Sequence, residues 1–218
     1  MAWRHSGVSV RGSWHLKTAT PCQDAHAILD RADLLVLAVA DGAGSARHAD
    51  LGATLATAHA LTWFADGWRP PADAAAWEAD LRDLLAELRA ALTAEAGRLG
   101  CSTRDLACTF LLALVTPTAL IGIQVGDGAI VYRPHSAGAA DALALLIVPS
   151  RGEYINETVF LISETCLQEA QFAYRDGAPE ALALFSDGLQ MLALDMTGQP
   201  LARPPRPLLR PTLRLRAG

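Results

Sequence analysis

Short apolar runs that end at turn residues dominate the chain, and two longer segments show helical spacing instead. Residues 34–40 (LLVLAVA) form a continuous apolar run that stops at an Asp-Gly pair, as expected for a buried strand that ends in a tight loop. In residues 49–65 and 73–99, apolar side chains recur every three or four positions, which predicts two amphipathic helices. Gly97 and Gly100 are expected to end the second helix.

After residue 100 the pattern changes to short segments typical of strands. Two of these segments flank Gly126-Asp127-Gly128, and an Asp-Gly turn between apolar runs predicts a hairpin. Besides 34–40, the predicted strands are residues 8–10, 25–29, 108–115, 119–125, 129–132, 142–148, 158–162, 169–174 and 181–185. Strands, then two long helices, then many strands indicate an α+β fold rather than the alternation of a parallel α/β sheet.

Composition restricts the class of protein. The 218 residues are 51% hydrophobic and 19% charged, which is typical of a globular chain with its own core. A net charge of −5 argues against a general nucleic-acid binder. The apolar runs are too short to cross a bilayer, and the first residues lack the pattern of a signal peptide. We therefore expect a cytoplasmic protein without nucleic-acid or membrane partners.

The last 19 residues differ in composition from the rest. Residues 200–218 contain five arginines, five prolines and no acidic residue. Prolines at this density are incompatible with a helix or a central strand. We therefore divide the chain into a folded domain at 1–199 and a Pro/Arg-rich tail at 200–218 that is expected to be disordered or non-native. The alternative is a basic arm that binds an acidic partner.

Acidic residues stand at the end or turn of several apolar strands. Asp41, Asp127 and Asp187 are each followed by glycine, and Asp24 lies near the start of a predicted strand. A single Asp-Gly pair is usually only a turn. Carboxylates fixed at several strand ends, however, can converge into a set of hard oxygen ligands for Mg²⁺ or Mn²⁺. Two such ions about 3.5–4 Å apart can activate a water molecule and bind a phosphate group.

Sequence motifs of several other kinds of site are absent. The chain has no Gly-x-x-x-x-Gly-Lys-Ser/Thr loop for nucleotide phosphates, no Gly-x-Ser-x-Gly elbow and no His-Glu-x-x-His zinc motif. Its four cysteines form no Cys-x-x-Cys pair, and they are expected to be free thiols.

Taken in order, the acidic motifs resemble those of the metal-dependent serine/threonine protein phosphatases of type 2C, in particular the bacterial members. The matching segments are PCQDA at 21–25, VADGAGSA at 39–46, ACT at 107–109, VGDGAIVYR at 125–133, GEYINETVFL at 152–161 and FSDGL at 185–189. The resemblance implies a four-layer α-β-β-α sandwich of two antiparallel sheets flanked by helices. The two long predicted helices would then cover one of the sheets.

The resemblance also implies a role for each acidic residue. Asp41 would bridge two Mn²⁺ or Mg²⁺ ions, and the carbonyl of Gly42 would be a further ligand. Asp187 would bind the second ion, and Asp127 with Asp187 would hold a weaker third. Asp24 would orient the water molecule that attacks the phosphorus. The implied catalytic residues are Asp24, Asp41 and Asp187, and the implied reaction is hydrolysis of phosphoserine or phosphothreonine in proteins.

Some positions depart from the family pattern. Gln23 stands where many relatives have a metal-binding glutamate. The expected phosphate-binding arginine is absent, so Lys17 or His15 is expected to take its place, the lysine as a point charge without a two-pronged donor. Ala43 stands where some relatives have a histidine that acts as a general acid, and His48 is the nearby alternative.

The end of the chain leaves a second function open. Relatives carry a final Asp-Asn or Asp-Asp motif, whereas no acidic residue follows Asp195 here. A truncated or altered C-terminal end would have this appearance. The alternative is therefore a catalytically weak or inactive pseudophosphatase that binds a partner. A third hypothesis is an α+β domain whose Asp-Gly pairs are only turns.

For a phosphatase, we expect a phosphoprotein substrate selected by loops 136–140 and 151–157, with a cognate kinase as a partner.

Overall fold

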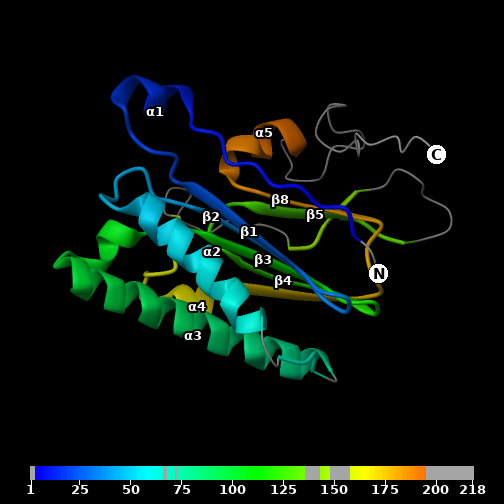
Figure 1. The fold of residues 1–218 in the computed structure, drawn as a ribbon. Helices are drawn as coiled ribbons and strands as arrows, with labels where there is room; N and C mark the ends of the chain where they lie inside the picture. The colour runs from blue at the N-terminus through cyan, green and yellow to red at the C-terminus, as the bar shows by residue number, and fades with distance from the viewer. Residues whose placement is uncertain (1–2, 66–67, 72, 136–142, 148–157, 195–218) are drawn as a thin grey trace.

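Two antiparallel sheets form the centre of the molecule in the computed structural model, which describes residues 3–65, 68–71, 73–135, 143–147 and 158–194 (Figure 1). The larger sheet has the strand order β1-β2-β3-β4-β7, and the smaller sheet has the order β6-β5-β8. The strands are β1 (Asp24–Asp30), β2 (Leu35–Asp41), β3 (Phe110–Val115), β4 (Ala119–Val125), β5 (Ala129–Arg133), β6 (Ala144–Leu145), β7 (Gln171–Asp176) and β8 (Ala181–Phe185).

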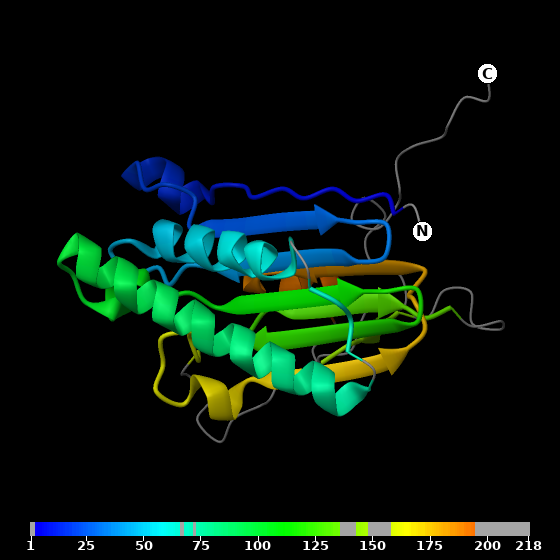
Figure 2. The same cartoon turned by 60° about the horizontal axis from the view of Figure 1, so that its bottom comes forward.

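Two long helices cover one face of the larger sheet (Figures 1 and 2). Helix α2 (Ala49–Ala65) matches the expected range, and α3 (Ala74–Leu99) begins one residue after the predicted start. Asp73 caps α3 by accepting a hydrogen bond of 2.9 Å from the backbone N–H of Ala76. Gly100 ends α3 in the left-handed conformation, whereas Gly97 lies inside it. Burial of the apolar stripe of α3 against α2 and the sheet stabilises this layer.

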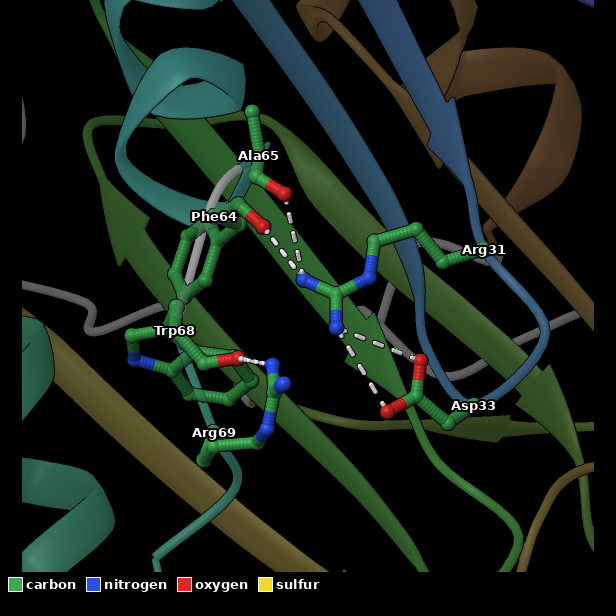
Figure 3. Close-up of polar contacts among 6 residues, drawn as sticks. All are labelled: Arg31, Asp33, Phe64, Ala65, Trp68 and Arg69. Atoms are coloured by element: carbon green, nitrogen blue, oxygen red, sulfur yellow. Dashed lines mark hydrogen bonds and ion pairs between the residues drawn. The ribbon is translucent and has the colours of Figure 1, made fainter.

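The turn between β1 and β2 holds the C-terminal end of α2 (Figure 3). The Arg31 guanidinium donates hydrogen bonds to the carbonyls of Phe64 at 2.8 Å and Ala65 at 3.3 Å. It also forms an ion pair with Asp33 at 3.4 Å. Because the last carbonyls of a helix lack partners within the helix, a cation at this end stabilises α2.

The smaller sheet packs on the opposite face of the larger one. Leu35, Leu111 and Leu120 of the larger sheet share a buried cluster with Ile130 of β5 and with Leu146. Helix α5 (Gln190–Ala193) lies beside the smaller sheet, on the side away from α2 and α3 (Figure 1). The expected α+β sandwich of two antiparallel sheets flanked by helices is confirmed.

The hairpin predicted at residues 126–128 is wrong. Strand β4 pairs with β3 and β7, whereas β5 pairs with β6 and β8 in the other sheet. Gly126 has a φ of +95°, and the chain passes there from one sheet to the other. The Asp-Gly pair therefore belongs to a connection between layers rather than to a turn within one sheet.

Some strands and helices differ from those expected. Residues 8–10 lie extended beside β1 without being a strand (Figure 2), and Val8 is 79% exposed, so burial does not stabilise a strand there. Residues 158–162 are not a strand either, because their backbone groups bond to other loops and side chains. The predicted strand at 142–148 is reduced to two described residues in β6. The helical segments not predicted are α1 (Ser13–Thr18), η1 (Thr103–Leu106), α4 (Cys166–Glu169), η2 (Asp187–Leu189) and α5.

Several predictions lie outside the described residues. These are the tail at 200–218, the loops 136–140 and 151–157, most of the segment 152–161, and Asp195. In the ranges that are described, the search for membrane spans found no helix with the length and apolar character to cross a bilayer.

Candidate active site

Four acidic residues come together at one end of the sandwich, and we call them the acidic cluster: Asp24, Asp41, Asp127 and Asp187. Asp24 begins β1 and Asp41 ends β2, and the antiparallel register places them opposite each other. Asp187 follows β8 and begins η2, and Asp127 lies in the connection between β4 and β5. The charges of the other three act on the carboxyl of Asp41, so the fold brings all four predicted acids together.

Burial and mutual repulsion perturb these carboxyl groups. Burial, together with the charges of Asp24, Asp187 and Asp127, raises the pKa of Asp41 to about 8. The pKa of Asp24 is also raised, mainly by burial and also by the charge of Asp187, although hydrogen bonds with Ser186 and Asp41 and the nearby His15 oppose the shift. The cluster therefore contains more negative charge than its surroundings compensate.

Thr109, directly before β3, and the loop after β2 fix the backbone around Asp41. The Asp41 N–H donates to the hydroxyl of Thr109 at 3.1 Å, and the Thr109 N–H donates to the Asp41 carbonyl at 2.8 Å. The N–H of Gly42 donates to the carbonyl of Gln23 at 3.1 Å. A Cβ at Gly42 would lie 2.7 Å from the carbonyl oxygen of Ala49, so this close approach to α2 requires glycine.

The connection between the sheets holds Asp127 by contacts that the sequence did not predict. The Thr158 hydroxyl donates to a carboxylate oxygen of Asp127 at 3.1 Å, and the side-chain amide of Gln190 donates to the Asp127 carbonyl. The buried Gln124 amide donates to the carbonyls of Gly126 at 3.2 Å and Gly128 at 2.9 Å. Only Gln124 could have been found from the sequence, as a lone polar side chain in an apolar strand.

The two candidate phosphate-binding residues lie on α1 and differ in their relation to the cluster. His15 is near enough to Asp24 to lower the pKa of that carboxyl. Lys17 is exposed in the same helix, and no described contact connects it to the cluster. The structure therefore brings His15, but not Lys17, to the acidic residues. The side-chain oxygen of Gln23 is buried and has no hydrogen-bond partner among the described residues.

The four cysteines are free thiols, as expected. Cys108 is fully buried beside the acidic cluster, and burial together with the charge of Asp41 raises its pKa to about 12. It therefore remains protonated at neutral pH and does not provide a nucleophile.

The acidic cluster has the donor chemistry of a site for hard divalent cations. Its side chains offer anionic oxygens, which Mg²⁺ and Mn²⁺ prefer, and a cation would relieve the repulsion that raises the pKa of Asp41. Among the described side chains, no group of three or more His, Cys, Asp or Glu residues is already arranged as a metal site. The acidic cluster therefore fits a divalent cation by the type of its donor atoms and by its charge.

Comparisons with known proteins agree with this chemistry. Residues 11–215 match the family described as Protein phosphatase 2C. The chain is 34% identical to Serine/threonine-protein phosphatase 3 of Escherichia coli (strain K12) over 206 residues, which cover 90% of this chain and 77% of the relative.

The fold is also similar to that of solved bacterial proteins. Serine/threonine phosphatase Stp1 from Staphylococcus aureus superposes with a TM-score of 0.57 at 16% identity, over 77% of this chain and 71% of that one. RsbX in complex with magnesium superposes with a TM-score of 0.50 at 13% identity, over 78% of this chain and 68% of that one.

The family match covers most of the chain, and the similarity to the Escherichia coli relative covers 90% of this chain and 77% of the relative. Nothing in these similarities favours a pseudophosphatase or a domain whose Asp-Gly pairs are only turns. The chain therefore belongs to the protein phosphatase 2C family, whose members are metal-dependent, and it is a serine/threonine protein phosphatase that acts on phosphoproteins.

Proposed function

We propose that the acidic cluster is the catalytic site of this phosphatase, and that Asp41, Gly42, Asp127 and Asp187 hold its divalent cations. The observation that carries the proposal is the convergence of four acids from both sheets: Asp24 lies opposite Asp41, and Asp127 and Asp187 are near enough for their charges to act on the Asp41 carboxyl. Such a concentration of anionic oxygens favours Mn²⁺ or Mg²⁺. The proposed complement is two ions with a weaker third. The similarity to RsbX, solved with magnesium, supports this type of ion.

The residues around the cluster have distinct proposed roles. When bound, the cations would supply positive charge to the phosphate oxygens and lower the pKa of a water molecule. Asp24 would accept a hydrogen bond from the attacking water and orient it toward the phosphorus, and Ser186 would hold Asp24 in place through their hydrogen bond. Asp41 and Asp187 complete the proposed catalytic residues.

Two basic side chains on α1 are proposed to bind the phosphate group of the substrate. His15 lies near Asp24, and Lys17 is in the same short helix. In place of an arginine, they would provide separate donors rather than one planar guanidinium.

The remaining parts of the proposal concern partners and organisation. A cognate kinase is proposed as the enzyme that phosphorylates the same substrate, and the cytoplasm as the location. The division into a phosphatase domain at 1–199 and a Pro/Arg-rich tail at 200–218 is likewise a proposal that rests on composition.

Hydrolysis of a small aryl phosphate tests the site assignment. We expect turnover with Mn²⁺ and its loss with a chelator. Asp41→Asn should lower kcat by about a hundredfold or more, because it removes a charged ligand at the centre of the cluster. The matched control is Asp83→Asn, which removes an exposed acid from α3 and should leave turnover unchanged. Turnover in Asp41→Asn equal to that of the unmodified chain would contradict the assignment.

A further inference from the structure

One short segment contacts both loops that carry central members of the acidic cluster. We call residues 158–163 the bracing segment. Thr158 donates a hydrogen bond to the carboxylate of Asp127. The carbonyl of Val159 lies against the same connection, since a Cβ at Gly126 would be 3.1 Å from it. Phe160 and Ile162 pack on the small apolar cluster beneath the loop after Asp41, whose members are Ala43, Ala46, Ala49 and Ala107.

The bracing segment is attached to the body of the protein by the buried Leu161 side chain, by backbone contacts and by Arg89 of α3. The Arg89 guanidinium donates to the carbonyl of Leu161 and, at 2.5 Å, to the carbonyl of Ser163. It also hydrogen-bonds to the thiol of Cys166. The N–H of Leu161 donates to the carbonyl of Cys108 at 2.9 Å, beside the strand that supports Asp41. A half-buried guanidinium thus gathers three acceptors at one turn.

The bracing segment connects Arg89 to Asp127: Arg89 holds the carbonyl of Leu161, and Thr158, three residues earlier, bonds to Asp127. The backbone between Thr158 and Leu161 is not part of a strand, so no sheet ladder fixes its position. At one end Arg89 holds two carbonyls of the bracing segment, beside the buried Leu161 and its bond to Cys108, and at the other end the segment contacts Asp127 through the Thr158 hydrogen bond. Groups that orient a ligand carboxylate alter metal affinity although they do not contact the metal.

We propose that Arg89 is a positioning residue that orients Asp127 for metal binding by holding the bracing segment in place. The inference rests on the proposed role of Asp127 as a ligand. Arg89 does not contact the acidic cluster itself in the described structure, so its effect passes through Thr158.

Arg82 provides a matched control on the same helix. It donates to the carbonyl of Leu167 at 3.0 Å and stacks on the ring of Phe172 with a separation of 4.5 Å. None of its described contacts involves the bracing segment or the acidic cluster. Arg82→Met and Arg89→Met therefore both remove a guanidinium that holds a backbone carbonyl to α3. Only the carbonyl held by Arg89 belongs to the segment that contacts Asp127.

Titration calorimetry with Mn²⁺ on the full chain tests the proposal without any assay of activity. The Mn²⁺ binding that disappears in Asp127→Asn defines the site of interest. Thr158→Val should weaken that site by about tenfold, and Arg89→Met by about threefold to tenfold. Arg89→Lys should be intermediate, because a lysine keeps the charge and one donor. Arg82→Met should leave the affinity unchanged, even where its melting temperature falls as far as that of Arg89→Met.

The double variant Arg89→Met/Thr158→Val should bind Mn²⁺ no more weakly than Thr158→Val alone, because the two changes act along one path. Full additivity would overturn the proposal, as would an affinity of Arg89→Met equal to that of Arg82→Met. If Arg89→Met does not fold, the Mn²⁺ affinities of Arg89→Lys and of Arg89→Lys/Thr158→Val test the proposal in the same way. Unchanged Mn²⁺ binding in Asp127→Asn would overturn the assignment of Asp127 itself, and this inference with it. Loss of binding in Asp127→Asn but not in the Arg89 variants would overturn the inference alone.

Discussion

At the scale of single residues, Asp41 has the strongest consequence for the behaviour of the protein. Its carboxyl has an ordinary pKa of 3.8, and burial beside three other acids raises that value to about 8. Between these two values the folded protein keeps a proton that the unfolded chain has lost. Because the folded state then binds more protons, each rise in pH within this window favours the unfolded state.

This difference predicts the pH dependence of stability in the presence of a chelator. The free energy of unfolding should fall as the pH rises from about 4 to about 8, and Asp41→Asn should reduce that fall, because it removes the group responsible. Urea unfolding of both proteins at pH 5 and pH 8 measures the effect. Equal changes in the two proteins would contradict the prediction.

At the scale of elements, the connections between helices and strands decide where the site lies. The turn between β1 and β2 caps α2 through Arg31 (Figure 3). The loop after β2 passes close to the first turn of α2 at Gly42. One helix is therefore fixed at both ends by the strands that carry Asp24 and Asp41. The register of these strands is consequently tied to the position of α2.

Removal of the cap should destabilise the protein without altering its chemistry. Arg31→Ala should lower the free energy of unfolding by about 1–2 kcal/mol, because the last carbonyls of α2 lose a charged donor. Asp33→Ala should cost less than about 0.5 kcal/mol, since its side chain is 51% exposed in the ion pair. Urea unfolding of the two variants checks the difference, and equal losses would contradict the role assigned to the cap.

The sequence predicted elements well where burial alone determines them. The fully buried strands β3 and β4 and the helix α2 were predicted with nearly the observed bounds, because continuous or periodic apolar residues have few other arrangements. Gly126-Asp127-Gly128 was misread, because the same turn residues serve a hairpin and a crossing between sheets. The hydrogen bond from Thr158 to Asp127 links positions 31 apart in the chain, and no local pattern reports such a contact.

At the scale of the whole molecule, the acidic cluster depends on both sheets. Asp24 and Asp41 belong to the larger sheet, Asp187 follows a strand of the smaller one, and Asp127 lies in the connection between them. A ligand that binds all of them binds only the packed sandwich. It therefore stabilises the folded state as a whole.

Thermal unfolding with Mn²⁺ measures this linkage. At an Mn²⁺ concentration about a hundred times Kd, the melting temperature should rise by about 5–10 °C. Asp41→Asn and Asp187→Asn should each abolish most of the rise, because each removes a proposed ligand from a different sheet. Asp83→Asn, at an exposed position on α3, should keep it. A rise of the same size in all four proteins would mean that Mn²⁺ binds elsewhere.

The crossing of the chain at Gly126 has a consequence for the synthesis of this enzyme in the cell. The first strand of the smaller sheet is made only after four strands of the larger one, and Asp187 follows still later. Until the two layers close on each other, the nascent chain has only scattered acids with ordinary surface chemistry. Under the proposed site assignment, catalytic competence requires both layers, so a chain whose two sheets have not yet packed together cannot remove phosphate groups from the proteins around it.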